Sequence, residues 1–301
     1  MSGFGVLRAA TRRSPLARWQ AEHVAALLRA VHPGLEVELV EVDTEVDQRL
    51  DVPISSFGGK GAFAKEVQQA VLDGRADVAV HSAKDLPSVT VDGLVLACVP
   101  ERGDTHDALV GATLDGLVPG ATVATGSLRR RAQLAAHRPD LAFAELRGNM
   151  ATRLTKVPQG GAIVVAAVAL QRLGLADRID DALDVDVMVP QAGQGALGVE
   201  CRVDDDATIA LLAAVEHRSS RRRVDAERAF LAELGGDCDL PAGAHANLPG
   251  VVDDDGLVLR AFLATDGTAE ARHARHIASG DDPVALGTSV ARHLRTALGS
   301  T

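Results

Sequence analysis

Three consecutive arginines, Arg129, Arg130 and Arg131, follow Ser127 at the start of a segment with helical apolar spacing. Ser127 is a favourable N-cap residue, so we expect the arginines in the first turn of a helix. Backbone N–H groups are unpaired there and the helix dipole is positive, which disfavours cations. Three guanidinium groups at this position therefore indicate a bound anion, because guanidinium binds carboxylate or phosphate in a bidentate manner.

Two more arginines, Arg147 and Arg153, follow the next apolar run. In an open α/β sheet both groups are expected at the ends of neighbouring strands, where such sheets bind ligands. The alternative is a solvated basic surface, which is the usual place for charged residues. Asp140 and Glu145 are the only acidic residues between positions 121 and 153, so we favour the anion site.

Asp85 is the strongest acid–base candidate in the chain. It follows Lys84 at the end of a buried-type strand predicted over 76–80, and Pro87 closes the segment. A carboxylate and an ammonium at a strand exit are placed for chemistry. Asp85 is equally acceptable as a turn residue, and His81 in the same segment is interpreted as a core histidine.

Another strand-to-helix junction lies near the N-terminus, after a strand predicted over 6–10. Ser14 as N-cap and Pro15 at the first helical position predict a helix start. Arg12 and Ser14 then lie at a second ligand-binding edge, and Gln20, one turn into the helix, faces the same opening. The alternative is that Ser14 only caps the helix and that Arg12 is solvated.

Two further cations are ambiguous by themselves. Lys60 lies in the glycine-rich stretch 57–63, which lacks the spacing of a phosphate-binding loop and predicts a loop ahead of a helix ending near Asp73. Lys60 is a candidate for reaching an anionic ligand. Arg172 follows the continuous apolar run 162–170.

The composition limits the classes of function. The chain has 301 residues, of which 47% are hydrophobic, enough for two or three domains. Its net charge of −10 and its aromatic content of 2% argue against a nucleic-acid partner. No apolar run reaches membrane-spanning length and no signal peptide is recognisable, so we expect no membrane partner.

Three cysteines, Cys98, Cys201 and Cys238, form an odd set without metal-ligand spacing. We therefore predict no metal and a reduced, cytoplasmic compartment. Cys98 and Cys201 lie in apolar strand contexts and are expected in the core. Cys238 lies on a loop framed by glycine and proline.

The order of elements predicts an α/β protein made of two halves joined by two crossovers, followed by a small C-terminal α+β domain. The last domain is expected to contain a helix over 224–234, hairpin turns at 255–256 and 265–267, and a closing helix over 282–298. The predicted domains are residues 1–99 with 196–215, residues 100–195, and residues 216–301.

Together these segments resemble the porphobilinogen deaminase, or hydroxymethylbilane synthase, family over nearly the whole length. The matching motifs occur in the family's order. They are Ala10-Thr-Arg-Arg-Ser-Pro-Leu-Ala17, Gly58-Gly-Lys-Gly61, Val80-His-Ser-Ala-Lys-Asp-Leu-Pro87, Gly126-Ser-Leu-Arg-Arg130, Leu146-Arg-Gly-Asn149, Gln194-Gly195 and Cys238-Asp-Leu-Pro241.

The resemblance implies two domains like those of periplasmic binding proteins, with the active cleft between them, and a third domain. It implies a monomeric transferase of heme and tetrapyrrole biosynthesis with a dipyrromethane cofactor on a thioether at Cys238. Four porphobilinogen molecules condense with loss of ammonia, and hydrolysis releases hydroxymethylbilane. Asp85 corresponds to the catalytic aspartate. The cofactor is held by Lys84, Asp85, Ser127, Arg129, Arg130, Arg147 and Arg153. The substrate path is lined by Arg12, Ser14, Gln20, Lys60, Arg147, Arg153 and Arg172.

This chemistry agrees with the residues. Each pyrrole ring of the growing chain carries two carboxylates, which many arginines can bind. Loss of ammonia leaves a cationic azafulvene, which a carboxylate can stabilise. Two positions depart from the family pattern: Gly126 replaces a common serine, and Asp237 replaces the usual glycine before Cys238.

Two other functions compete with this one. A non-catalytic, two-lobed anion-binding module would use the same arginines and would need neither Asp85 nor Cys238. A nucleic-acid regulator using residues 129–131 is disfavoured by the acidic net charge.

Overall fold

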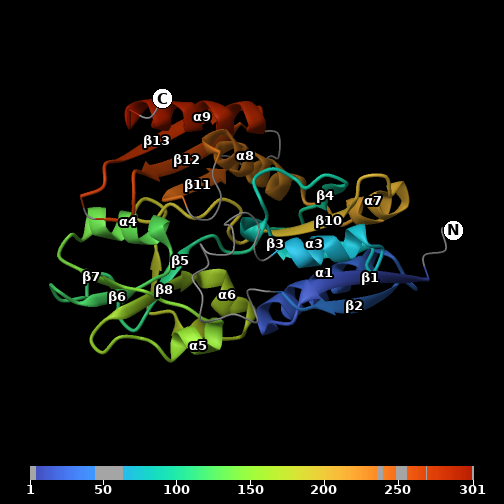
Figure 1. Cartoon of the computed structure of the whole chain (residues 1–301), viewed down its shortest axis with the longest axis horizontal. Coiled ribbons are helices and arrows are strands. Elements are labelled where there is room, and N and C mark those ends of the chain that lie inside the picture. The colour runs from blue at the N-terminus through green and yellow to red at the C-terminus, as the bar shows by residue number, and fades with distance from the viewer. Residues whose placement is uncertain (1–4, 45–63, 236–239, 249–255, 269, 300–301) are drawn as a thin grey trace. The chain divides into compact units, whose positions relative to one another are not determined.

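The computed structural model describes residues 5–44, 64–235, 240–248, 256–268 and 270–299 (Figure 1). The chain divides into two compact units, Met1–Arg102 with Ala196–Arg222 and Gly103–Gly195 with Arg223–Thr301. The last boundary falls inside one helix, α8 (Arg218–Leu234). Each unit contains its own sheets and cores.

The first unit is built on a five-stranded sheet of order β2-β1-β3-β10-β4. Strand β1 runs parallel to β2 and β3, whereas β10 is antiparallel to both β3 and β4. The late strand β10 therefore completes a sheet begun by the N-terminal segment. The strands are β1 (Val6–Arg12), β2 (Glu36–Val42), β3 (Val78–Ser82), β4 (Leu94–Cys98) and β10 (Leu197–Arg202).

Helices cover both faces of this sheet, because successive strand residues point to opposite sides. Leu7 and Ala9 pack with the helices α1 and α7, while Ala10 packs with α3 on the other face. Ser14 caps α1 by accepting the backbone N–H of Ala17 at 3.2 Å, as its sequence predicts. The helices are α1 (Pro15–Val31), α3 (Lys65–Leu72) and α7 (Asp206–Ala213), with a 3₁₀ turn η2 (Ala83–Asp85) after β3.

The second unit contains a five-stranded sheet of order β7-β6-β8-β5-β9. Strand β6 is parallel to β7 and β8, and β5 is antiparallel to β8 and β9. Figure 1 shows α4 on one side of this sheet and α5 and α6 on the other. The elements are β5 (Asp107–Val110), β6 (Thr122–Ala124), α4 (Leu128–His137), β7 (Ala142–Ala144), α5 (Met150–Leu154), β8 (Ala162–Ala166), α6 (Ala167–Arg172), η3 (Ala176–Arg178) and β9 (Asp181–Leu183).

The same unit also contains an antiparallel three-stranded sheet of order β11-β12-β13. Leu257 and Leu259 of β12 pack with helices α8 and α9, whereas Phe262 and Ala264 point the other way and pack against Ala132 of α4. The C-terminal sheet therefore covers the outer side of the arginine-bearing helix. The elements are β11 (Ala242–Asn247), β12 (Leu257–Ala264), β13 (His273–Gly280) and α9 (Pro283–Ala297).

The predicted α/β class with a small C-terminal α+β part is confirmed. The strand predicted over 76–80 instead spans Val78–Ser82, and the helix predicted over 224–234 begins at Arg218. Residue His217, just before that helix, pairs one of its first-turn amides: Nδ1 of His217 accepts the backbone N–H of Ser220 at 3.3 Å. Ser220 Oγ in turn accepts the backbone N–H of Arg102 at 2.9 Å. The hairpin turn predicted at 255–256 lies partly outside the described residues.

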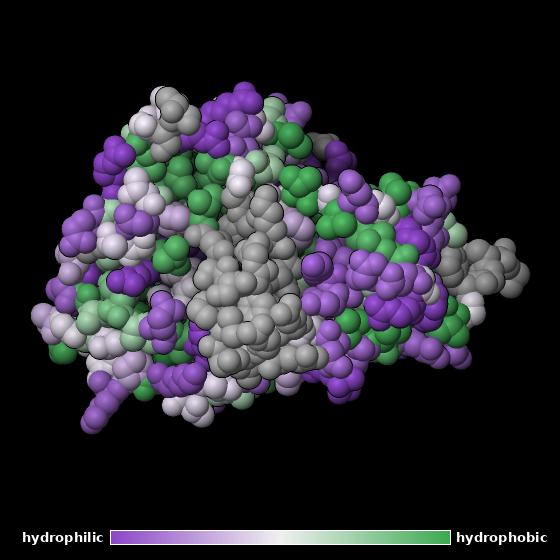
Figure 2. All heavy atoms as spheres, in the orientation of Figure 1, coloured by the Kyte–Doolittle hydropathy of each residue, from purple (hydrophilic) through white to green (hydrophobic). Residues whose placement is uncertain are grey.

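Polar and apolar residues are mixed on the surface of the protein. On the face drawn in Figure 2, hydrophilic and hydrophobic residues alternate over short distances. Among the described residues, no helix combines the length and the apolar character needed to cross a bilayer.

Candidate active site

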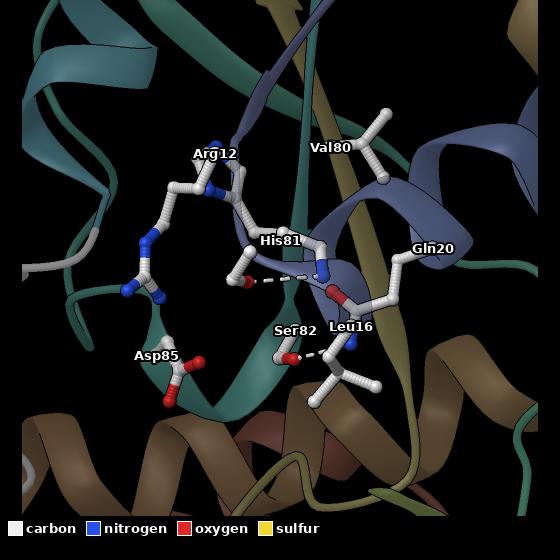
Figure 3. Close-up of a pocket in the computed structure, with 9 residues that line it drawn as sticks. Arg12, Leu16, Gln20, Val80, His81, Ser82 and Asp85 are labelled. Atoms are coloured by element: carbon white, nitrogen blue, oxygen red, sulfur yellow. Dashed lines mark hydrogen bonds between the residues drawn. The ribbon is translucent and has the colours of Figure 1, made fainter. Parts of the chain in front are cut away.

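The first unit has a pocket at the edge of its sheet where the parallel strands β1 and β3 end (Figure 3). Ligands of open α/β sheets bind at this edge. The predicted residues Arg12, Ser14, Gln20 and Asp85 come together there, although they are up to 73 positions apart. The lining residues are Arg12, Ser14, Leu16, Ala17, Gln20, Val80, His81, Ser82 and Asp85.

Hydrogen bonds fix the two sides of this pocket. Gln20 Nε2 donates to Ser82 Oγ at 2.8 Å, which ties the first turns of α1 to the end of β3. In Figure 3 the side chain of Arg12 extends toward the carboxylate of Asp85. A guanidinium and a carboxylate therefore border the same opening, suited to a substrate that carries both an anionic and a cationic group.

Lys84 and Asp85 occupy the short 3₁₀ turn η2, and both side chains are partly exposed. The turn is attached to the sheet because the backbone N–H of Ala83 donates to Ala196 O at 3.0 Å. Lys60 lies outside the described residues.

A buried acidic residue adjoins the pocket. Glu200 of β10 and His81 of β3 have side chains that are only 2% and 4% exposed, with Oε2 and Nε2 separated by 3.3 Å. Gln68 of α3 donates its Nε2 to the same Glu200 oxygen at 2.8 Å. His81 is therefore a core histidine, as expected, but one facing a carboxylate that the sequence analysis did not single out.

A second set of polar residues lies at the corresponding edge of the sheet β7-β6-β8-β5-β9. Ser127 caps α4 by accepting the backbone N–H of Arg130 at 3.4 Å, and Asn149 caps α5 through Thr152. Arg147 lies in the turn between β7 and α5. Arg153 donates its Nε to Gly148 O at 2.8 Å, so its side chain folds over this turn.

Arg129 and Arg130 point into the protein and are only 3% and 7% exposed. Both pair with the fully buried Asp107 at the start of β5: Arg129 Nη1 lies 2.7 Å from Oδ2, and Arg130 Nη2 lies 2.8 Å from Oδ1. The expectation that Asp140 and Glu145 are the acidic residues near these arginines was wrong. The antiparallel strand β5 brings Asp107 to this edge beside the last residue of β8.

One carboxylate faces two guanidinium groups, so this buried cluster has a surplus positive charge. Burial alone raises the pKa of Asp107, but the charges of Arg129 and Arg130 outweigh it and hold that pKa below its ordinary value. Nε and Nη2 of Arg129 are buried, and neither has a hydrogen-bond partner among the described residues. Buried donors are rarely left unpaired, so an anionic group is the natural complement of this cluster.

Arg131 differs from its two neighbours. Its guanidinium carbon lies 5.6 Å from the ring centroid of Phe143 on β7, a cation–π distance. Arg131 therefore packs on the sheet strand next to its helix and does not join the pair at Asp107.

Arg172 at the end of α6 donates its Nη2 to Gly195 O at 2.7 Å. The same carbonyl accepts the backbone N–H of Gly103 at 3.1 Å. Burial lowers the pKa of Arg172 to about 10, so it stays charged at neutral pH. Gly195 O therefore accepts from both Arg172 and Gly103, and Gly103 and Gly195 are the two ends of the stretch 103–195 of the second unit.

Gly126 permits a close approach between two turns. A Cβ atom at this position would lie 2.9 Å from the carbonyl oxygen of Leu146, closer than side chains normally come. The turn that ends in Ser127 therefore packs directly against the turn that begins with Arg147. The departure from serine at position 126 has a structural reason in this chain.

Two cysteines are buried and inert. Burial and the nearby Glu216 raise the pKa of Cys98, and burial raises the pKa of Cys201 to about 11. Both thiols therefore stay protonated at neutral pH and are poor nucleophiles. Cys238 lies outside the described residues.

The two α/β sheets, each with cationic and hydrogen-bonding residues at its ligand-binding edge, define a protein of the periplasmic-binding-protein class. Residues 7–210 match the family description "Porphobilinogen deaminase, dipyromethane cofactor binding domain", and residues 221–296 match "Porphobilinogen deaminase, C-terminal domain". The chain belongs to the porphobilinogen deaminase family. It is therefore a transferase of porphyrin biosynthesis whose cofactor is dipyrromethane.

Solved structures with partial similarity have low sequence identity. YhfZ from Shigella flexneri aligns over 78% of this chain and 93% of its own, with 18% identity and a TM-score of 0.38. A nutrient binding protein from Burkholderia cenocepacia bound to methionine aligns over 69% of this chain and 90% of its own, with 15% identity and a TM-score of 0.41.

Proposed function

We propose that this chain is a hydroxymethylbilane synthase: it condenses four porphobilinogen molecules head to tail on a dipyrromethane primer, with loss of one ammonia each time. Hydrolysis then releases the linear tetrapyrrole. The observation that supports the proposal most directly is the buried cluster of Arg129, Arg130 and Asp107. It has a surplus positive charge, and two of its guanidinium donors have no hydrogen-bond partner in the part of the chain that the structure describes.

The residues present fit the cofactor. Dipyrromethane bears two carboxylates on each ring and supplies, when bound, a nucleophilic pyrrole carbon for the first condensation. Two guanidinium groups with one acidic partner complement such a polyanion. Ser127 at the N-terminus of α4 adds a hydroxyl beside them. We assign Lys84, Asp85, Ser127, Arg129, Arg130, Arg147 and Arg153 to binding this group, and the thioether to Cys238.

We assign Asp85 the catalytic role. When the C–N bond of porphobilinogen breaks, ammonia departs with the electron pair and the substrate pyrrole becomes cationic. The Asp85 carboxylate stabilises this positive charge, and it accepts the proton lost from the pyrrole carbon that forms the new C–C bond. Arg12 borders the same pocket and is suited to bind a substrate carboxylate.

The substrate residues are proposed to be Arg12, Ser14, Gln20, Lys60, Arg147, Arg153 and Arg172. Ser14 and Gln20 are already engaged within the first unit, so both act mainly by shaping the pocket. Arg172 donates one N–H to Gly195 O, and a guanidinium has five N–H donors, so it can bind a carboxylate of the growing chain while it keeps this bond.

We also propose the domain division 1–99 with 196–215, 100–195 and 216–301, with the first two domains acting on the same ligand. The proposed enzyme acts as a monomer in the cytoplasm, with porphobilinogen as its small-molecule partner and no nucleic-acid partner. The anionic substrate agrees with local arginine clusters in a chain of net charge −10.

Intact mass spectrometry tests this proposal. Purified protein is expected to carry the mass of a dipyrromethane, and cofactor-free protein should gain that mass when incubated with porphobilinogen. Cys238→Ser should abolish both the mass and turnover. Cys201→Ser is the matched control, because its protonated, buried thiol cannot provide the attachment. If Cys238→Ser kept both the mass and the activity, the proposal would be wrong.

A further inference from the structure

A single buried carboxylate, that of Glu227 on α8, joins three segments of the second unit. Glu227 is fully buried. Its Oε2 accepts the backbone N–H of Gly193 at 2.7 Å, and its Oε1 accepts the backbone N–H of Ala246 at 2.8 Å. Each carboxylate oxygen therefore holds a different segment, the loop 191–195 or the strand β11, against α8.

Both amides depend on this side chain. Gly193 lies in a turn with a φ of +74°, outside any strand or helix. Ala246 lies on β11, an edge strand of its sheet, where alternate N–H groups point away from the neighbouring strand. Two residues earlier, the N–H of Ala244 also points away and donates to Pro190 O at 2.9 Å. A buried amide without an acceptor is costly, so Glu227 stabilises both positions.

The segment held in this way touches the arginine cluster at both of its ends. Val189 O accepts Nη1 of Arg129 at 2.7 Å. Gln194 donates its Nε2 to Asp107 Oδ1 at 3.0 Å. Residues 189–194 therefore form one wall of the cluster, and β11 and Glu227 support that wall from the other side.

The contact with β11 is close. A Cβ atom at Gly243 would lie 2.6 Å from Val189 O, so the strand and the segment pack backbone against backbone. Little space is available for the segment to shift while β11 stays in place. The carboxylate of Glu227 sets the distance at the far end of this contact, near Gly193.

We propose that Glu227 is a positioning residue for the cofactor-binding arginines. By holding Gly193 and Ala246 together it keeps Gln194 on Asp107, and Asp107 in turn orients Arg129 and Arg130. The consequence for the cofactor rests on the proposed function, whereas the hydrogen bonds themselves do not.

The first experiment measures hydrogen exchange of the Gly193 and Ala246 amides by NMR. In the wild type, both are expected to be protected, although Gly193 is a loop amide. Glu227→Gln has one acceptor oxygen in place of two and presents an NH₂ group to the other amide. One of the two amides should then exchange about tenfold to a hundredfold faster. Glu233→Gln, on the same helix but partly exposed and paired with Arg292, is the matched control and should leave both unchanged.

The second experiment measures how fast cofactor-free protein gains mass from porphobilinogen. At equal folded fraction, we expect the Glu227→Gln variant to gain mass about tenfold more slowly than the wild type. The reason is that the loss of one hydrogen bond at residue 227 changes the alignment of Asp107, Arg129 and Arg130. Glu227→Asp keeps the charge but is shorter by one methylene, so it should resemble Glu227→Gln. If Glu227→Asp gains mass at the wild-type rate, the charge of residue 227 is important and the length of its side chain is not. The positioning role is then refuted.

The outcomes separate the two proposals. Wild-type protein that gains no mass contradicts the proposed function, while protected amides at Gly193 and Ala246 would still support the hydrogen-bonding role of Glu227. Faster exchange in Glu227→Gln with wild-type loading would show that Glu227 serves stability alone. An unprotected Gly193 amide in the wild type, which needs no folded variant, would refute the inference at its first step.

Discussion

Replacing Asp107 by asparagine is expected to destabilise the second unit strongly. Among the described residues, the Asp107 carboxylate accepts from Arg129 Nη1 on Oδ2 and from Arg130 Nε and Gln194 Nε2 on Oδ1, and Arg130 Nη2 also lies 2.8 Å from Oδ1. Asparagine has one oxygen and one NH₂ group, so one guanidinium group would face a donor, and both would lose their counter-charge. Breaking a buried pair in this way costs about 3–5 kcal/mol. That is a large fraction of a typical unfolding free energy of roughly 5–15 kcal/mol.

Urea denaturation followed by far-UV circular dichroism measures this loss. The only tryptophan, Trp19, lies in the first unit, so its fluorescence reports that unit separately. Asp140→Asn is the control. Asp140 pairs with Arg138 on the surface, where solvent screens the pair, so its removal should have a much smaller effect. A loss below about 1 kcal/mol for Asp107→Asn would refute the view that Asp107 neutralises two buried arginines.

The pH dependence gives an independent check. Because the folded pKa of Asp107 is held below its ordinary value of about 3.9, the folded state binds fewer protons than the unfolded state in acid. This contribution to stability is present above about pH 4 and is lost as the pH falls through the folded pKa. The difference between wild type and Asp107→Asn should therefore narrow below about pH 4. A difference independent of pH would contradict an ionised Asp107.

Two further predictions concern single residues of the site. Gly126→Ser should lower the free energy of unfolding by about 1–3 kcal/mol, because the serine Cβ would lie 2.9 Å from Leu146 O. An unchanged urea midpoint would show that the two turns separate freely. Asp85→Asn should reduce turnover of porphobilinogen by about 10²–10⁴-fold, with little change in the urea midpoint since Asp85 is partly exposed. Wild-type turnover in Asp85→Asn would refute the catalytic role assigned to Asp85.

Local rules predicted the ends of several elements correctly. Ser14 and Ser127 each cap a helix through a backbone N–H three residues later. Asp282 likewise caps α9. A cap depends on a few consecutive residues and is readable from them. The placement of Arg12 and Asp85 at one sheet edge was also predictable, because parallel strands bring their carboxyl ends together.

Where local reading failed, the missing information came from distant segments. The helix predicted over 224–234 begins at Arg218, and its first turn contacts a distant segment: Ser220 Oγ accepts the backbone N–H of Arg102, 118 positions away. Glu200 lies in an apolar strand, and a charge in such a strand signals a buried partner. The sequence does not say that this partner is His81.

The sequence by itself determined the family, the capped helices and the residue types at each strand end, since these depend on motifs and short spacings. Only the tertiary structure decided which charges meet. Arg129 and Arg130 look in sequence like a free anion site, but an antiparallel strand brings Asp107, 22 and 23 positions away, between them. Buried charges require partners in a low dielectric, and strand order, not spacing along the chain, selects those partners.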